Sequence, residues 1–235
     1  MTISKSQYIK GLQCHKYLWL QKKRPELRDT LDSAQISLYN SGTNVGELAC
    51  ELFPGGVEVK FTKDDFNAML SKTKALIANG TDVIYEATFS EDGIFAMADI
   101  LVRRGDKWDM YEVKGSTGVK DAHIDDAAIQ WYALSKAIEL DRAFIVHINN
   151  QYVRDGELDV QQLFAIADIT DQVQDKQYKI EASLDEMYEM LQNAEPDIDI
   201  GGHCSSPYNC EFRDHCWKNI PSPSIFNLYW MNGAK

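Results

Sequence analysis

The chain lacks any long hydrophobic run, and none of its 235 residues belongs to an internal repeat or a low-complexity tract. A membrane-spanning helix needs about 20 consecutive apolar residues, so none is expected, and no stretch resembles a secretory signal peptide. The chain also lacks a linker long enough to separate domains. We therefore predict a cytoplasmic protein with no membrane contact and a single domain, 1–235. Its core covers about 32–170, and a lobe is formed by 1–28 together with 200–235.

Positive charge is scarce, with 24 Lys and Arg against 36 Asp and Glu and a net charge of −12. Such a balance argues against a protein that coats nucleic acid by bulk attraction. The charge is uneven, however, because residues 1–28 carry a balance of +6 and residues 151–199 a balance of −10. The basic segment, which includes Lys16, could form a positive patch that binds substrate. A solvated lysine-rich helix face explains it equally well.

Cysteine is also scarce, but three of the five cysteines lie within thirteen residues (Cys204, Cys210 and Cys216), and Cys14 lies near the other end of the chain. In a cytosolic protein such a group favours metal ligation over disulfides. Four thiolates suit an iron–sulfur cluster or zinc. The long gap after Cys14 is not typical of a local zinc finger, yet His15, His203 and His215 leave a mixed zinc site open. Cys50 is expected in the core.

Two apolar segments, 94–104 and 107–114, flank Gly105-Asp106, a pair typical of a two-residue hairpin turn. Both segments are apolar on both faces, as in a sheet that helices cover on each side. With this turn, Arg104 faces Lys107.

Acidic residues oppose each other further along this hairpin, where Asp99 faces Glu112. Lys114 shares their face because side chains alternate along a strand. Like charges directly opposite are unfavourable, and a divalent cation offsets them. We therefore predict a metal beside this pair; the alternative is a solvated hairpin with ordinary charged residues.

The remaining pattern alternates helices and strands. Helical spacing predicts helices over about 32–52, 63–78 and 124–140, and strands are expected over 83–89 and 142–148. One or two surface helices are expected within 168–199. The order of helix, helix, three strands, helix and strand indicates an α/β core. The first helix carries an apolar stripe of Leu38, Val45, Leu48, Ala49 and Leu52; the second has Thr62 as its expected cap.

This arrangement resembles the PD-(D/E)XK nuclease superfamily, in particular its RecB-like branch. The resemblance rests on an acidic helix before the sheet, Asp99, the run Glu112-Val113-Lys114 and a helix bearing Gln130. One cysteine before the core and three after it resemble the iron–sulfur members of that branch, such as the CRISPR-associated and AddB-type exonucleases. The run 202–217 is most similar to an uncharacterised bacterial family of this kind.

The resemblance implies a restriction-endonuclease-like core, with a mixed central sheet flanked by helices and with chain ends joined by a metal cluster. It also implies roles for individual residues. Asp99, Glu112 and the Val113 carbonyl would ligate Mg²⁺ or Mn²⁺. Lys114 would position or activate the attacking water and stabilise charge on the phosphate, and Gln130 would orient the lysine or the backbone. The four cysteines would hold a structural 4Fe–4S cluster, with Zn²⁺ as the alternative.

Two positions depart from the family pattern. Many relatives have a metal-binding His on the first helix, where this chain has Gly46, so that Glu47 is the candidate acidic partner and Glu86 the alternative. The aromatic residue after Gln130 is Tyr132, a candidate substrate contact, at a shorter spacing than in relatives.

The predicted function is a metal-dependent deoxyribonuclease that acts on single strands or ends. The first alternative is a catalytically weak nucleic-acid-binding or assembly subunit with a protein partner. The second is an RNA-processing nuclease. The chemistry is consistent with the predicted deoxyribonuclease, because a metal polarises phosphate and lowers the pKa of bound water.

Overall fold

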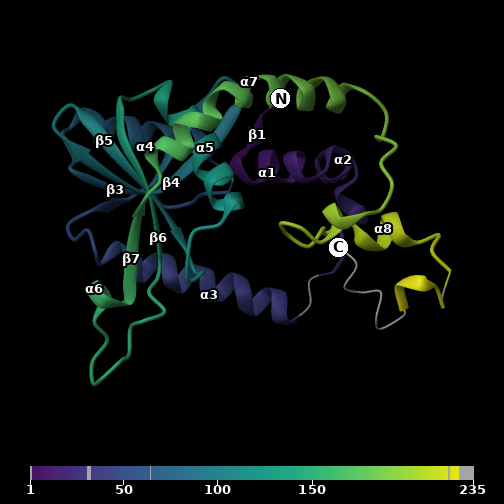
Figure 1. Cartoon of the computed structure of the whole chain (residues 1–235). Helices are drawn as coiled ribbons and strands as arrows, with labels where there is room; N and C mark the ends of the chain where they lie inside the picture. The colour runs from purple at the N-terminus through teal and green to yellow at the C-terminus, as the bar shows by residue number, and fades with distance from the viewer. Residues whose placement is uncertain (1, 31–32, 64, 222, 228–235) are drawn as a thin grey trace. The chain divides into compact units, whose positions relative to one another are not determined.

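The computed structural model describes residues 2–30, 33–63, 65–221 and 223–227, and for 33–41 it describes the backbone alone (Figure 1). The chain divides into two compact units. The first contains Met1–Ser6 and Asp32–Ala182, and the second contains Gln7–Leu31 and Ser183–Lys235. None of the described helices is long and apolar enough to cross a membrane.

The first unit is built on one mixed sheet, with strand order β2-β3-β4-β5-β6-β7 and β1 paired to β4. The sheet is mixed, because β1–β4, β2–β3 and β5–β6 are parallel pairs and β3–β4, β4–β5 and β6–β7 are antiparallel pairs. The predicted α/β class with a mixed central sheet flanked by helices is therefore confirmed. Its elements are β1 (Ile3–Ser4), α3 (Ser33–Cys50), β2 (Val57–Glu58), α4 (Phe66–Ala78), β3 (Val83–Glu91), β4 (Ile94–Arg104), β5 (Lys107–Lys114), α5 (Asp121–Ser135), β6 (Leu140–Ile148), α6 (Val160–Leu163), β7 (Phe164–Asp168) and the first part of α7 (Thr170–Gln192).

The β4–β5 hairpin has the predicted turn and register. Arg104 pairs with Lys107, and the ladder continues without a bulge to Ile100 opposite Tyr111. Gly105 has a φ of 65°, a left-handed conformation that a glycine adopts without steric cost. The predicted hairpin and its register are therefore confirmed.

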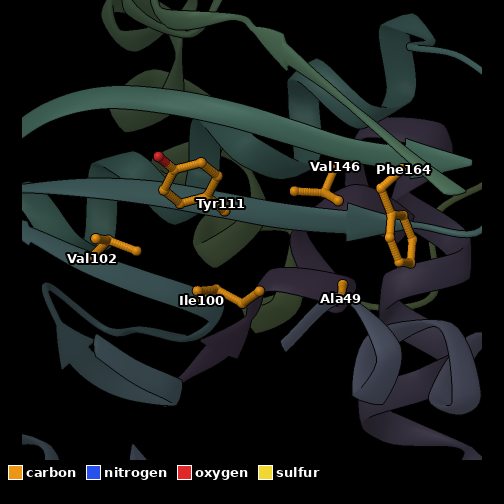
Figure 2. Close-up of a cluster of buried hydrophobic side chains, with 6 residues drawn as sticks. All are labelled: Ala49, Ile100, Val102, Tyr111, Val146 and Phe164. Carbon is orange, nitrogen blue, oxygen red and sulfur yellow. The ribbon is translucent and has the colours of Figure 1, made fainter. Parts of the chain in front are cut away.

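The two faces of the sheet bury different side chains. On the α3 face, alternate residues of β4, β5 and β6 form an apolar cluster with α3 and β7, drawn in Figure 2 and made of Ala49, Ile100, Val102, Tyr111, Val146 and Phe164. Val45, Leu48, Cys50 and Leu52 pack against it, as the helical stripe and the core assignment of Cys50 predicted. The side chain of Leu38 lies outside the described residues. Asp99, Glu112 and Lys114 have the opposite parity in their strands, so they belong to the face that α5 covers.

Several boundaries differ from the sequence-based expectation. The N-cap of α4 is Asp65, which accepts a hydrogen bond from the Ala68 N–H at 2.9 Å, so the assignment to Thr62 is wrong. Helix α5 ends at Ser135, because Leu140 already pairs with Trp108 in the parallel β5–β6 ladder. Strands β1, β2 and β7 were not predicted; the first two have two residues each, too few to show a strand period.

The second unit joins both ends of the chain. It contains most of α1 (Lys5–Gln13), α2 (His15–Lys23), η1 (Pro25–Leu27), the end of α7, η2 (Gly202–Cys204), α8 (Arg213–Trp217) and η3 (Ile225–Asn227). Tyr17, Leu20 and Phe212 form its buried apolar cluster. Polar contacts connect the two segments as well: Lys10 Nζ lies 2.8 Å from Glu211 Oε2. The predicted lobe was bounded at 1–28 and 200–235, whereas this unit contains Gln7–Leu31 and Ser183–Lys235 and therefore includes the end of α7.

Candidate active site

The site forms where β4 and β5 separate. Their ladder ends at the pair Ile100–Tyr111, and the next residue of β4, Asp99, accepts a hydrogen bond from the Val113 N–H through Oδ2 at 2.7 Å. Further along the same strand, β1 pairs with Ile94 and Phe95. Residues 96–99 of β4 therefore lie between the β1 and β5 ladders, and the charged side chains of the site gather beside them.

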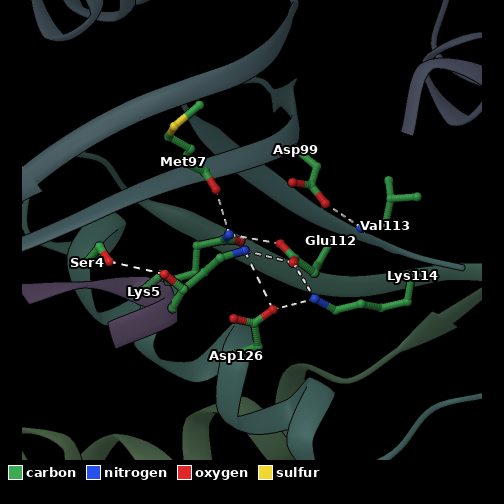
Figure 3. Close-up of polar contacts among 10 residues, drawn as sticks. Ser4, Lys5, Met97, Asp99, Glu112, Val113, Lys114 and Asp126 are labelled. Atoms are coloured by element: carbon green, nitrogen blue, oxygen red, sulfur yellow. Dashed lines mark hydrogen bonds and ion pairs between the residues drawn. The ribbon is translucent and has the colours of Figure 1, made fainter. Parts of the chain in front are cut away.

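Glu112 is at the centre of these contacts, and its carboxylate is 2% exposed. Lys114 Nζ donates to Oε1 at 2.7 Å (Figure 3). Gln130 Nε2 donates to Oε2 at 2.8 Å. Gln130, on α5, also donates to the Met97 carbonyl at 2.7 Å. Four residues expected at one site from the sequence, Asp99, Glu112, Lys114 and Gln130, thus lie together on β4, β5 and α5.

Two residues that the sequence did not single out complete this group. Lys5, directly after β1, donates to Glu112 Oε1 at 2.8 Å and lies 3.6 Å from Asp126 Oδ2. Asp126, on α5, accepts a hydrogen bond from Lys114 (Figure 3). Asp126 precedes Gln130 by one helical turn, and this i, i+4 spacing was a signal that could have found it. No local pattern marks Lys5.

The charges of this group perturb one another strongly. Burial and then the neighbouring Glu112 raise the pKa of Asp99 to about 7. Burial alone would raise the pKa of Glu112, but Lys114 and Lys5 outweigh it and hold that pKa below its ordinary value. Burial raises the pKa of Asp126. The strongest ion-pairing in the group is therefore centred on Glu112.

Glu86 also belongs to this group. In the β3–β4 ladder the pairs on either side of it are formed, and by register it stands opposite Asp99, but no pair is formed there. Its φ of 56° is left-handed, which costs a non-glycine residue on the order of 1 kcal/mol or more. Burial raises its pKa, and Glu112 contributes. We call Glu86, Asp99, Glu112 and Asp126, with Lys5 and Lys114, the carboxylate site.

The other candidate residues of this unit lie apart from these contacts. The side chain of Glu47, on α3, is exposed. Tyr132 is buried on α5, with Lys136 Nζ 4.7 Å from its ring centroid. Two helical positions separate Tyr132 from Gln130, about 200° around the helix, so the two side chains leave on opposite sides.

The four cysteines Cys14, Cys204, Cys210 and Cys216 line one cavity in the second unit, together with Lys16, Tyr17, Leu20 and His203. We call this the cysteine cavity. All four thiols are free, and the Cys210 N–H donates to the Cys204 carbonyl at 3.0 Å. Lys16 binds Glu195 at 3.3 Å beside the cavity, so in the structure this candidate substrate contact pairs with an acidic side chain.

Burial controls the thiols of this cavity. It raises the pKa of Cys210 to about 12, and the neighbouring cysteines add to the shift. It also raises the pKa values of Cys14 and Cys216. Burial therefore favours the protonated form of Cys14, Cys210 and Cys216, and a metal that binds these sulfurs must replace their protons.

The two donor sets can be compared with the metals that the sequence suggested. Within the described residues, no three His, Cys or acidic side chains are arranged as ligands of one ion. The chemistry of each set nevertheless fits. The carboxylate site has four acidic groups against two ammonium groups, an excess of negative oxygen donors that suits Mg²⁺ or Mn²⁺. The cysteine cavity has four sulfur donors, which suit iron–sulfur clusters or zinc.

Comparisons with known proteins are limited to distant folds. No model of a known protein family matches the chain, and no curated protein matches it in sequence. The solved structure of SSO0001 covers 84% of this chain and 79% of its own at 16% identity, with a TM-score of 0.42. An alkaline exonuclease from Laribacter hongkongensis, LHK-Exo, covers 81% of this chain and 90% of its own at 13% identity, with a TM-score of 0.36. Superpositions this loose transfer no function.

Proposed function

We propose that this protein is a metal-dependent nuclease that hydrolyses phosphodiester bonds at the carboxylate site. One observation carries the proposal: Asp99, Glu112, Lys114 and Gln130 converge from two strands and a helix through hydrogen bonds of 2.7–2.8 Å. Buried acidic groups are costly unless they are compensated or functional, and strongly perturbed carboxylates are typical of active sites.

Mg²⁺ or Mn²⁺ would be held by Asp99 and Glu112, with the Val113 carbonyl and Glu86 as further oxygen ligands. Such an ion supplies Lewis acidity and lowers the pKa of water. Glu86 is favoured over Glu47 because it shares the electrostatic environment of Asp99 and Glu112, whereas Glu47 is exposed.

The lysine and the glutamine have separate roles in this proposal. Lys114 donates hydrogen bonds to negatively charged oxygens, so it would stabilise charge growing on the phosphate and orient the attacking water. Gln130 fixes the Glu112 carboxylate by binding both Oε2 and the Met97 carbonyl. We propose DNA, at ends or in single strands, as the substrate, which follows the family resemblance.

We also propose that the four cysteines hold a 4Fe–4S cluster that stabilises the second unit, with zinc as the alternative. Four thiols from both ends of the chain line one cavity, and this supports a single metal centre. Iron, sulfide and zinc analysis of protein purified without oxygen distinguishes the two metals.

The first test is cleavage of end-labelled single- and double-stranded DNA with Mg²⁺ or Mn²⁺. Glu112→Gln keeps the size of the side chain and removes its charge, so activity should be lost. Asp109→Asn is the matched control: Asp109 is also a buried acid on β5, three residues away, but it bonds Arg104 at 2.7 Å on the other face. It should retain cleavage.

Three other outcomes contradict parts of the proposal. Equal cleavage by wild type and Glu112→Gln contradicts the assigned site. Folded protein that binds DNA without cutting it indicates the binding or assembly subunit, whose protein partner would do the cutting. Preference for matched RNA substrates indicates the RNA-processing nuclease.

A further inference from the structure

Lys5 places a second ammonium group on the carboxylate that the proposed metal needs. Its Nζ lies 2.8 Å from Glu112 Oε1, and Lys114 Nζ lies 2.7 Å from the same oxygen (Figure 3). Gln130 occupies Oε2. Oε1 of Glu112 thus accepts from both lysines, so a cation that binds this oxygen competes with an ammonium group.

The two lysines are not held equally. Lys114 makes hydrogen bonds to both Glu112 and Asp126. Lys5 makes one to Glu112, and its distance of 3.6 Å from Asp126 is an ion pair beyond hydrogen-bonding range. Losing Glu112 therefore leaves Lys114 with a hydrogen-bonded partner, whereas Lys5 keeps only the longer ion pair.

The positions of the two lysines in the fold also indicate that Lys5 is held less firmly than Lys114. Lys114 is the last residue of β5, which pairs on both sides within the sheet. Lys5 begins α1 directly after β1, a two-residue strand paired only at Ile94 and Phe95. Moving the Lys5 ammonium needs only rotation of a flexible four-carbon side chain.

We propose that Lys5 is an internal cation that holds Glu112 until a divalent metal displaces it, and so sets the metal affinity of the site. Lys5 is a positioning residue in this role. The inference rests on the proposed function, because it assumes that Glu112 binds the metal. It also explains how four neighbouring acidic groups are tolerated: Lys5 and Lys114 together offset part of their charge.

The test is Mn²⁺ affinity, measured by electron paramagnetic resonance of the free ion or by calorimetry on the whole protein. Lys5→Met removes the charge and keeps an unbranched side chain. It should tighten Mn²⁺ binding by about tenfold or more, since a competing positive charge within about 4 Å is lost. Lys5→Gln should tighten it too, and Lys5→Arg should restore the wild-type affinity.

Lys10→Met is the matched control. Lys10 lies on the same helix, forms an ion pair of the same 2.8 Å length and is 19% exposed, against 20% for Lys5, but its partner is Glu211 in the second unit. It should leave Mn²⁺ affinity unchanged. A merely structural role for Lys5 predicts the opposite sign, because local damage weakens a metal site.

Glu112→Gln separates failure of this inference from failure of the proposed function. If Mn²⁺ binding requires Glu112 but is equal or weaker in both Lys5→Met and Lys5→Gln, Lys5 does not compete and the inference is wrong. If Mn²⁺ binding is absent, or persists unchanged in Glu112→Gln, the proposed metal site is wrong and the inference falls with it.

Discussion

The carboxylate site and the cysteine cavity both gather residues that are distant in the sequence, but the charge states of their candidate metal ligands differ. In the carboxylate site, Glu112 is ionised and paired with two ammonium groups at 2.7–2.8 Å. In the cysteine cavity, burial raises the pKa values of the Cys14, Cys210 and Cys216 thiols. A metal that binds Glu112 must therefore compete with an ammonium group, whereas a metal entering the cysteine cavity must displace protons from thiols. Binding at the cysteine cavity should consequently strengthen more steeply as pH rises.

The sharpest way to break this comparison is to remove one thiol. Cys210→Ser should abolish iron binding, because a hydroxyl is a poor replacement for a thiolate in an iron–sulfur centre. Mn²⁺ binding at the carboxylate site should remain. Iron analysis and Mn²⁺ titration of the same sample measure both effects. Cys50→Ser is the control, since Cys50 packs in the first unit's core and should leave iron unchanged; equal iron loss in both variants would contradict the assignment.

The next largest effect is expected at Lys114. Lys114→Met should slow single-turnover DNA cleavage by about 100- to 1000-fold, the usual cost of losing one donor to a developing charge. Iron content should not change. Unaltered cleavage in a folded Lys114→Met protein would remove this residue from the chemistry, and Lys114→Arg tests whether charge alone suffices.

The cysteine unit should also depend on its apolar cluster. Phe212 is fully buried against Tyr17 and Leu20, so Phe212→Ala should lower the free energy of unfolding of metal-free protein by about 3–5 kcal/mol. Phe61→Ala is the control, because Phe61 is 59% exposed and its loss should cost about 0.5 kcal/mol or less. Denaturant titration measures both. An unaffected Phe212→Ala protein would mean that metal alone organises this unit.

The smallest effect concerns a helix cap in the first unit. Asp65→Ala should lower unfolding free energy by about 1 kcal/mol because the Ala68 N–H loses its acceptor. Thr62→Ala should cost less, since Thr62 does not cap α4 in the structure. The reverse order in denaturant titrations would restore the sequence-based assignment. Neither change should alter iron content.

The sequence predicted the parts of the fold that follow from local rules. The turn at Gly105-Asp106 and strict alternation along β4 and β5 were enough to put Asp99, Glu112 and Lys114 on one face. Lys5 could not be found this way, because its contact with Glu112 spans 107 residues and depends on the pairing of a two-residue strand. The boundary of α5 was misplaced because Leu140, apolar and suitably spaced for a helix, pairs with Trp108 instead.

The place of β1 has a consequence for how the molecule folds. Ile3 pairs with Ile94, and Lys5 contacts Glu112, so residues 3–5 reach their partners only after the hairpin has formed. Contacts of such high sequence separation require closure of a long loop and are slow to form. We expect the other strands to assemble first, and β1 to pair with the beginning of β4 last. Lys5 would then be among the final side chains to reach the native state.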